Sequence, residues 1–156
     1  MAREHRYSAT VAWTGASRGP TVNYESYSRD YEVRIAGKPP LKGSADPTFR
    51  GDPAVHNPED LLVAALSACH MLTYLAVCAR KGVAIVAYED EAGGTMVLER
   101  GGGHFVEVVL RPRVRVAAGS DLDAARAAHE EAHRQCFIAS SVNFPVRHEA
   151  VVEAAR

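Results

Sequence analysis

The feature that most constrains this chain is a long apolar run at residues 58–82, PEDLLVAALSACHMLTYLAVCARKG. Asn57 followed by Pro58 supplies an N-cap side chain and then a proline at the first helical position. Two cations followed by Gly82 are typical of a helix C-terminus. The run therefore predicts one long helix over 58–82 that can form the core of a small protein.

Strand-like alternation of apolar and polar residues surrounds this predicted helix. The alternating segments are residues 6–13, 21–28, 30–37, 83–93, 95–101 and 104–116, and a short strand is expected in the closing segment 142–155.

The connections between these segments also have recognisable signals. Residues 13–20 predict a turn, and glycines at 93–94 and 101–103 predict tight hairpin links. Residues 37–58 are rich in proline and glycine and predict a loop. Residues 120–136 begin with a serine cap and predict an amphipathic helix. The order predicts an α+β fold with helices against an antiparallel sheet.

Composition narrows the class of protein. A chain of 156 residues predicts a single domain over 1–156 that needs neither disulfide nor metal to build a core. A net charge of -1 gives no electrostatic footprint for nucleic acid. The charged start lacks an apolar signal core, and charges bracket the apolar run, so we expect no export, no membrane span and a cytoplasmic location. Three cysteines in such a protein predict transient, chemical disulfides.

Helical spacing decides which thiols can meet. Cys78 follows Cys69 by nine positions, about half a turn round the helix and ~13.5 Å along it, which is too far for a disulfide. We expect Cys78 to be a buried small hydrophobe. Cys136 ends the second helix before a loop-like segment, where a second thiol could approach the first as a peroxidatic and resolving pair requires. Spacing alone leaves open that Cys69 is buried and inert.

Glu59 and His70 flank Cys69 in the sequence. Glu59 precedes Cys69 by ten positions, ~15 Å of helical rise, so either the helix breaks after its first turn or Glu59 serves a cysteine on a partner subunit. The second possibility predicts a dimer with shared sites. His70 points about 100° away from Cys69, which favours a satisfied or interface histidine over a general base.

Three segments carry a family resemblance: NPEDLLVAALSACH at 57–70, HRQCFIAS at 133–140 and TGASRG at 14–19. With them, the chain resembles the OsmC/Ohr family of thiol peroxidases (osmotically inducible protein C and the organic hydroperoxide resistance proteins). The residues after Cys69, HMLTY, are more similar to a less characterised OsmC-like branch. The resemblance implies antiparallel sheets packed around a long central cysteine-bearing helix, in an intertwined homodimer with sites at the interface.

The resemblance also implies roles for residues. Cys69 would be the peroxidatic thiolate and Cys136 the resolving thiol. Arg18 would stabilise the Cys69 thiolate and bind the peroxide oxygens, while Glu59 would orient the Arg18 guanidinium. Two nearby residues are alternatives for this arginine: Arg29 and Arg34. The implied activity reduces organic hydroperoxides, with lipid hydroperoxides as one candidate class, to alcohols. It proceeds through a Cys69 sulfenic acid and a Cys69–Cys136 disulfide. An external dithiol, with a lipoylated protein as one candidate, would reduce this disulfide and regenerate both thiols. No metal or cofactor is implied.

Two other interpretations stay open. His129, His133 and Cys136 are spaced i, i+4, i+7 and fall on one helical face, as metal ligands might, with His70 or Cys69 to complete the site. Alternatively, the chain is a ligand-binding protein that keeps the fold and its apolar pocket without peroxidase activity.

Overall fold

A computed structural model describes residues 3–155 of the chain. Its internal contacts divide the chain into two compact units, Met1–Leu61 (unit 1) and Leu62–Arg156 (unit 2).

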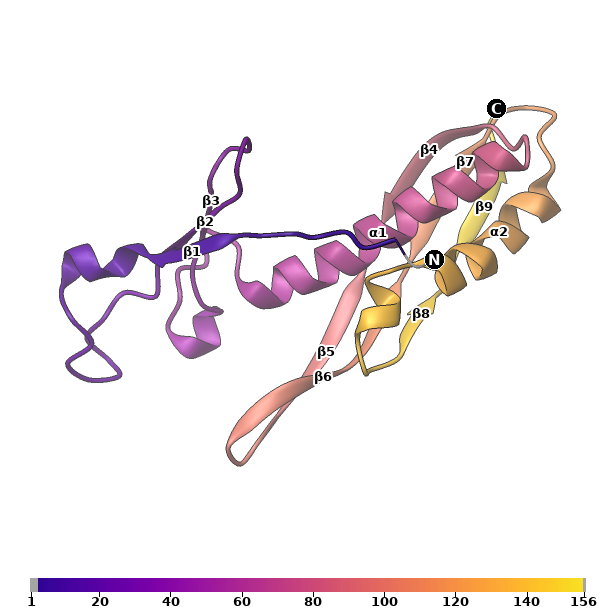
Figure 1. Cartoon of the computed structure of the whole chain (residues 1–156). Coiled ribbons are helices and arrows are strands. Elements are labelled where there is room, and N and C mark those ends of the chain that lie inside the picture. The colour runs from indigo at the N-terminus through magenta and orange to yellow at the C-terminus, as the bar shows by residue number, and fades with distance from the viewer. Residues whose placement is uncertain (1–2, 156) are drawn as a thin grey trace. The chain divides into compact units, whose positions relative to one another are not determined.

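Unit 1 contains one three-stranded antiparallel sheet (Figure 1). Its strands are β1 (Thr10–Trp13), β2 (Tyr31–Arg34) and β3 (Leu41–Gly43), in the order β1-β2-β3. Two 3-10 turns, Thr14–Arg18 and Pro47–Phe49, complete the unit. The predicted loop at 37–58 therefore holds a short strand, β3, and the second of these turns.

The predicted strand at 21–28 is wrong, because these residues form bends and turns. Their polar side chains bond locally instead of leaving the backbone free to pair: Asn23 Oδ1 accepts a hydrogen bond from the backbone N–H of Glu25 at 3.0 Å. Alternation in the sequence was thus a weaker signal than the turn-forming asparagine and serines within it.

The predicted long helix is α1, Pro58–Arg80, and it is unbroken. Asn57 caps it, since its Oδ1 accepts the N–H of Asp60 at 2.8 Å. At the other end, the N–H of Gly82, whose φ is 71°, bonds to the carbonyl of Ala79, and the N–H of Val83 bonds to that of Cys78. This is the Schellman arrangement that the glycine was expected to provide.

By length and composition, α1 could cross a membrane, which corrects the expectation that no segment has the required length. Within the described chain, 28% of its most apolar window is buried. Core helices of soluble proteins have the same length and composition. In unit 2, α1 contributes Leu66, Tyr74 and Val77 to packed clusters, as such a core helix does.

Unit 2 has two three-stranded sheets, which together with its helices give the predicted α+β class. The first has the order β4-β7-β9, with β4 (Ile85–Asp90), β7 (Pro112–Val116) and β9 (Val151–Ala154). The second has the order β5-β6-β8, with β5 (Gly93–Glu99), β6 (Gly102–Leu110) and β8 (Val146–His148). The pairs β6–β8 and β7–β9 are parallel, so the sheets are not purely antiparallel as predicted.

Proline and glycine explain the other differences in this unit. The predicted strand 104–116 is divided into β6 and β7 at Pro112, which has no N–H to donate to a ladder. The predicted closing strand is likewise divided into β8 and β9. Gly94, predicted in a hairpin link, lies inside β5, where an added Cβ would meet Phe105 Cε1 at 2.7 Å and Val63 Cγ2 at 2.9 Å. A hairpin joins β5 and β6 at Gly101, as predicted (Figure 1).

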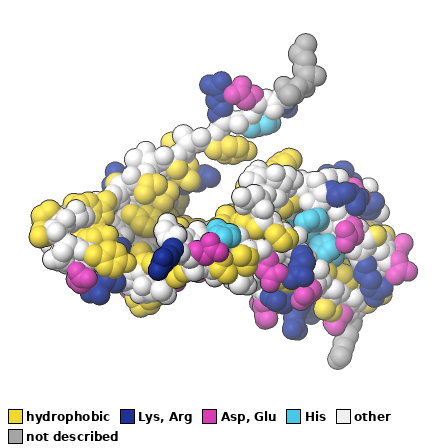
Figure 2. Space-filling view, turned by 90° about the horizontal axis from the view of Figure 1, so that it is seen from below, with side chains coloured by type: hydrophobic (Ala, Val, Ile, Leu, Met, Phe, Trp, Pro, Cys, Tyr) yellow, Lys and Arg dark blue, Asp and Glu magenta, His cyan; other side chains and the backbone are white. Residues whose placement is uncertain are grey.

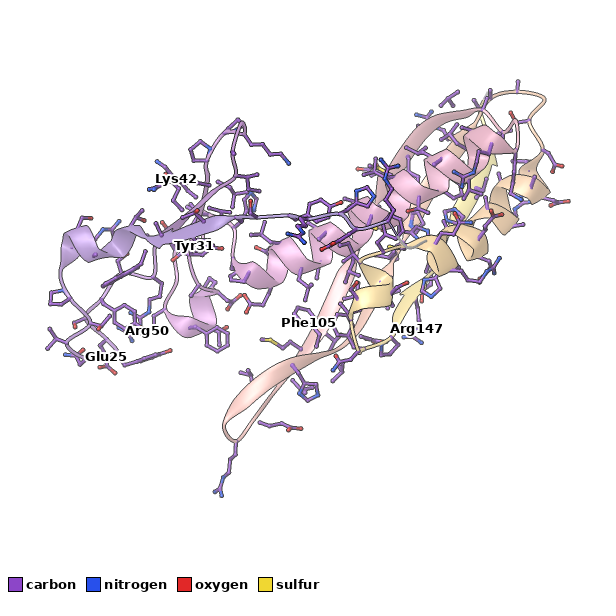
Figure 3. All side chains as sticks on the ribbon, in the orientation of Figure 1. Glu25, Tyr31, Lys42, Arg50, Phe105 and Arg147 are labelled. Atoms are coloured by element: carbon purple, nitrogen blue, oxygen red, sulfur yellow. The ribbon has the colours of Figure 1, made fainter. Side chains whose placement is uncertain are left out.

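The second helix is α2, Leu122–Gln135, and its cap is Asp121 instead of Ser120. Asp121 Oδ1 accepts the N–H groups of Asp123 and Ala124, both at 2.9 Å. One core cluster joins α1 and α2 to the β4-β7-β9 sheet (Figure 1). A second cluster joins α1 to the β5-β6-β8 sheet; there Phe105, labelled in Figure 3, lies 5.6 Å from the Phe144 ring, centroid to centroid. The two helices that bear cysteines are thereby fixed on one framework.

Acidic and basic side chains are intermixed on the surface of unit 2. Acidic and basic groups are intermixed on the face drawn in Figure 2, and ion pairs such as Arg147–Glu107 cross between strands. This surface has the mixed character expected from the balanced net charge.

Candidate functional site

Cys69 and Cys136 come together in unit 2. Cys69 lies half-buried in the middle of α1, and Cys136 is the buried C-cap of α2, 1% exposed. Both are free thiols, and Cys69 lies close enough to Cys136 to raise the pKa of its thiol. Cys78 is fully buried in the core, as predicted. Two thiols distant in the sequence thus lie near each other, while the third is buried in the core.

The backbone around Cys136 is held by a network of local bonds. The Cys136 N–H donates to the carbonyl of His133 at 3.3 Å, ending α2. The Cys136 carbonyl accepts from Ser140 twice, from the N–H at 3.0 Å and from Oγ at 2.9 Å. The predicted loop after Cys136 therefore folds back as a turn, Ala139–Ser141, in the 3-10 conformation.

The surroundings of Cys136 keep its thiol protonated. Burial raises the pKa of Cys136, the neighbouring Cys69 thiol raises it further, and the backbone N–H groups of Ala139 and Ile138 partly oppose this. Cys136 therefore retains its proton at neutral pH.

A groove of about 770 Å³ opens beside Cys69 within unit 2. Its walls are mostly apolar, from α1 and from the segment after Cys136, with two arginines at the rim. The lining residues are Ala65, Ala68, Cys69, Leu72, Thr73, Ala76, Arg80, Arg134, Gln135, Phe137 and Ser140. Leu72 is 62% exposed and Phe137 82% exposed, so large apolar side chains face outward here.

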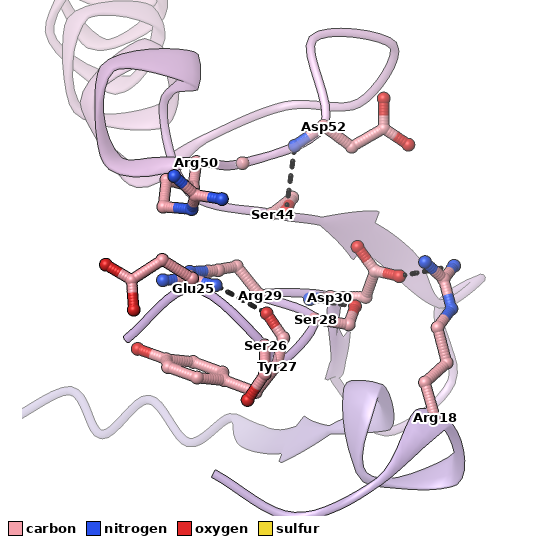
Figure 4. Close-up of a pocket in the computed structure, with 11 residues that line it drawn as sticks. Arg18, Glu25, Ser26, Tyr27, Ser28, Arg29, Asp30, Ser44, Arg50 and Asp52 are labelled. Atoms are coloured by element: carbon pink, nitrogen blue, oxygen red, sulfur yellow. Dashed lines mark hydrogen bonds and ion pairs between the residues drawn. The ribbon is translucent and has the colours of Figure 1, made fainter. Parts of the chain in front are cut away.

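The predicted Arg18 and Glu59 both belong to unit 1. Arg18, at the end of the first 3-10 turn, pairs with Asp30 Oδ2 at 2.8 Å (Figure 4). Glu59 Oε2 is buried without a hydrogen-bond partner among the described residues. The predicted Arg18–Glu59 pair is therefore not formed within the described chain. Because α1 is unbroken, Glu59 also stays ten residues from Cys69 along one helix.

The alternative arginines are engaged elsewhere in unit 1. The Arg29 guanidinium lies over the rings of Tyr24 and Tyr27 and donates to the carbonyls of both. Arg34 pairs with Glu32 at 2.6 Å. Arg29 and Arg18 both line a polar pocket of about 610 Å³ (Figure 4). Of the three candidates, Arg18 has the most exposed pairing, with 71% of its side chain accessible.

Glu59 has a neighbour that the sequence did not indicate. Burial raises the pKa of Tyr31, and the charges of Glu59 and Asp60 raise it further. Tyr31, on β2 (Figure 3), therefore lies close to the first turn of α1 within unit 1.

A cluster of four histidines, which we call the histidine cluster, lies where α1, α2 and β8 meet in unit 2. Its members are His70 on α1, His129 and His133 on α2, and His148 on β8. His70 Nε2 and His129 Nδ1 are 3.1 Å apart, and their rings are nearly parallel. The His148 ring lies 5.4 Å from that of His70 and 5.7 Å from that of His129, centroid to centroid. The sequence did not predict His148, because only the parallel pairing of β8 with β6 brings it here.

Burial shifts the titration of this cluster. Burial first, and the neighbouring histidines second, lower the pKa of His70 to about 4 and that of His129 to about 3. Both rings are therefore neutral at pH 7, and a neutral pair can share one hydrogen bond. His70 Nδ1 and His129 Nε2 are buried without a partner among the described residues.

The metal site considered from the sequence is not supported by this geometry. Among residues 3–155, no three His, Cys, Asp or Glu side chains are arranged to hold one ion. Cys136 interacts with Cys69 instead of joining His129 and His133. The three ligands share a helical face as predicted, but they do not share a site.

The fold and the neighbouring thiols together define a class: an α+β protein in which a cysteine of the long helix lies near a cysteine at the end of the second helix. Residues 51–150 match the family model described as OsmC-like protein. The chain belongs to the OsmC-like family.

Solved structures agree with this assignment. An OsmC-like protein of unknown function from Vibrio cholerae is 32% identical with a TM-score of 0.85, and the match covers 95% of this chain and 100% of that one. An organic hydroperoxide resistance protein from Elizabethkingia anophelis, solved with thiocyanate bound, is 20% identical with a TM-score of 0.70, covering 99% and 100%.

A putative organic hydroperoxide resistance protein from Vibrio cholerae, with captopril bound in one of its active sites, is 21% identical. Its TM-score is 0.68, and the match covers 97% of this chain and 94% of that one. These last two likenesses, below 25% identity, establish the fold. No curated protein matches the sequence.

Proposed function

We propose that this protein is a cysteine-based peroxidase that reduces organic hydroperoxides to alcohols. The observation that carries the proposal is the contact between a half-buried Cys69 and a buried, protonated Cys136 beside an apolar groove. The family includes proteins named for organic hydroperoxide resistance, which agrees with this chemistry.

The reaction begins at Cys69. Its thiolate attacks the O–O bond, forms Cys69 sulfenic acid and expels an alkoxide, which takes a proton from solvent and leaves as the alcohol. The Cys136 sulfur then attacks the Cys69 sulfur, and the hydroxyl leaves as water with the Cys136 proton. An external dithiol, of which a lipoylated protein is our first candidate, reduces the resulting disulfide and is itself oxidised.

The apolar groove supports an organic substrate over hydrogen peroxide. The alanines and Leu72 would bury the alkyl chain of an organic hydroperoxide next to Cys69, which would favour its binding. Hydrogen peroxide has no alkyl chain and would gain nothing from these apolar walls. Lipid hydroperoxides are one class that would gain from such a wall.

Arg18 and Glu59 complete the proposed site from a second copy of the chain. An arginine near Cys69 would stabilise the thiolate and the peroxide oxygens, and Glu59 would orient it. The exposed apolar side chains of Leu72 and Phe137 are consistent with a surface that a second copy covers. We therefore propose a homodimer of single-domain subunits with shared sites, located in the cytoplasm.

The test is turnover with purified protein. With tert-butyl hydroperoxide and dihydrolipoamide, peroxide loss should require Cys69, so Cys69→Ser should abolish it. Cys78→Ala is the matched control, because Cys78 is a free thiol on the same helix but in the core. Absence of peroxide consumption with every dithiol tried would exclude the proposal. A non-catalytic binding protein, the second candidate, is favoured if the groove takes up an apolar ligand saturably and Cys69→Ser leaves that uptake unchanged.

A further inference from the structure

A buried hydrogen bond between two histidine side chains connects the helices that carry the reactive cysteines. His70 directly follows Cys69 on α1, and His129 lies two turns before Cys136 on α2. The bond between them, His70 Nε2 to His129 Nδ1, is 3.1 Å long, and the residues are 1% and 2% exposed. No step of the proposed reaction uses either histidine.

The rest of the α1–α2 contact has one other buried hydrogen bond, from the Tyr74 hydroxyl to the carbonyl of Ala125, near the opposite end of α2 from Cys136. The buried face of α2 is otherwise alanine, from Ala125, Ala128 and Ala132, which allows close packing but has no large side chain to resist rotation. Two further polar contacts between the helices, Arg80–Gln135 and Lys81–Glu131, involve exposed side chains and are therefore weak.

The position of His129 on its helix makes the bond relevant to Cys136. Seven residues are almost two whole turns, so His129 and Cys136 project from the same side of α2. A rotation of α2 that separated His129 from His70 would therefore also carry the Cys136 sulfur away from Cys69.

The bond is held in place by the rings around it. Tyr74 stacks on His129 with 3.9 Å between ring centroids, and His148 meets both His70 and His129 edge to face. Tyr74 is itself fixed, since its hydroxyl donates to the carbonyl of Ala125 at 3.1 Å. The two imidazoles therefore have little freedom to reorient.

We propose that the His70–His129 pair is a positioning contact that holds the Cys136 thiol against Cys69, so that disulfide formation outruns overoxidation of Cys69. This inference rests on the proposed peroxidase function. A Cys69 sulfenic acid has two fates: attack by Cys136, which releases water, or reaction with a second hydroperoxide, which gives the sulfinic acid and an alcohol. The first depends on the distance and angle between the sulfurs, and a misplacement of about 1 Å can cost on the order of a hundredfold in rate.

The experiment compares variants of the pair with a matched neighbour. His129→Leu removes the bonding nitrogen, and His129→Asn restores an amide near the position of Nδ1. Tyr74→Phe is the control, because it deletes the other buried α1–α2 hydrogen bond and keeps the ring that stacks on His129. The readout is the ratio of Cys69–Cys136 disulfide to Cys69 sulfinic acid after excess tert-butyl hydroperoxide, measured by mass spectrometry. The rate of Cys69 oxidation is measured separately in a Cys136→Ser background.

The proposal predicts a drop on the order of tenfold or more in that ratio for His129→Leu, recovery in His129→Asn and little change in Tyr74→Phe. Oxidation of Cys69 itself should be unaffected. An unchanged ratio in His129→Leu, or an equal loss in Tyr74→Phe, would overturn it. His70→Phe provides a second deletion that keeps a ring; if neither deletion variant folds, the pair serves the fold as a whole and the proposal is rejected.

A peroxide-free arm separates this inference from the proposed function. Oxidised glutathione forms a mixed disulfide with one of the two thiols and releases one glutathione. The other thiol then attacks the protein sulfur of the mixed disulfide, which closes the intramolecular disulfide and releases the second glutathione. In His129→Leu the mixed disulfide should persist, whereas wild type should close. The wild-type protein could form the intramolecular disulfide with glutathione without reacting with peroxide, while His129→Leu forms no such disulfide. That result would reject the proposed peroxidase function and support the positioning role. If both proteins close equally fast, the positioning role fails.

Discussion

Cys136, buried at the C-cap of α2, lies close to Cys69, which is half-buried in the middle of α1. This relationship makes the two thiols unequal. Cys69 lines the groove, whereas Cys136 is buried, and burial raises the pKa of Cys136 and keeps its thiol protonated at rest. Attack by Cys69 first and Cys136 second follows from that inequality.

Cys136→Ser should separate the two steps. Cys69 should still react with hydroperoxide, but the sulfenic acid should persist and then advance to sulfinic acid as peroxide increases. Dimedone labelling followed by mass spectrometry detects the first product and intact mass the second. Wild type under the same conditions should yield mainly disulfide; equal sulfinic acid in the two proteins would rule out a resolving role for Cys136.

Arg18→Met tests the arginine assignment. If Arg18 of a second copy stabilises the thiolate and the peroxide, this change should slow oxidation of Cys69 on the order of a hundredfold, the cost of losing one such charge-stabilising group. Stopped-flow measurement of Cys69 oxidation at pH 7 gives the rate. Arg34→Met is the matched control, since Arg34 pairs with Glu32 on the same strand. A slower rate in Arg34→Met and a normal one in Arg18→Met would reverse the assignment.

Asp90 should be important for stability near the site. Its two oxygens accept hydrogen bonds from Ser67 Oγ on α1 at 2.5 Å and from the Arg111 N–H before β7 at 2.6 Å. Asp90→Ala should lower the free energy of unfolding by about 2–3 kcal/mol, because both donors lose a charged acceptor. Urea titration measures this loss. Asp123→Ala is the surface control, with a 94% exposed side chain, and should change stability by less than about 1 kcal/mol.

Stability should fall as the pH is lowered through the range in which unfolded histidine titrates. The folded-state pKa values of His70, about 4, and His129, about 3, lie below the ordinary value of 6.5, and that of His148 is also lowered. Below pH 6.5 the unfolded chain binds protons that the folded chain does not, so acid favours unfolding. Between pH 6.5 and pH 5, each buried histidine should cost on the order of 2 kcal/mol.

Urea unfolding at pH 7.5 and pH 5 measures this dependence. His70→Phe removes one of the titrating groups and should flatten the curve, whereas His104→Phe, at an exposed position on β6, should leave it unchanged. Stability that is independent of pH over this range would contradict the burial of the cluster.

The sequence predicted the parts of this molecule that local signals control. The cap at Asn57, the closing Gly82 and the apolar run between them correctly indicated α1, because each acts within a few residues. The expectation that Cys78 is buried in the core, which rests on the usual burial of free cysteine, is also confirmed.

Features that depend on tertiary contacts were beyond the sequence. The parallel pairing of β8 with β6, which delivers His148 to the histidine cluster, joins segments far apart in the chain. The strand expected at 21–28 failed because side chains such as Asn23 bond to their own backbone. The pairing of Arg18 with Asp30 is a long-range contact of the same kind.

The most direct test of the account is the product of a single oxidation. Fully reduced protein should be treated with one equivalent of tert-butyl hydroperoxide and mapped by peptide mass spectrometry without reduction. The account predicts one intramolecular disulfide between Cys69 and Cys136, with Cys78 still a free thiol and an equal amount of tert-butanol released. Protein that keeps all three thiols, with the hydroperoxide intact, would contradict it.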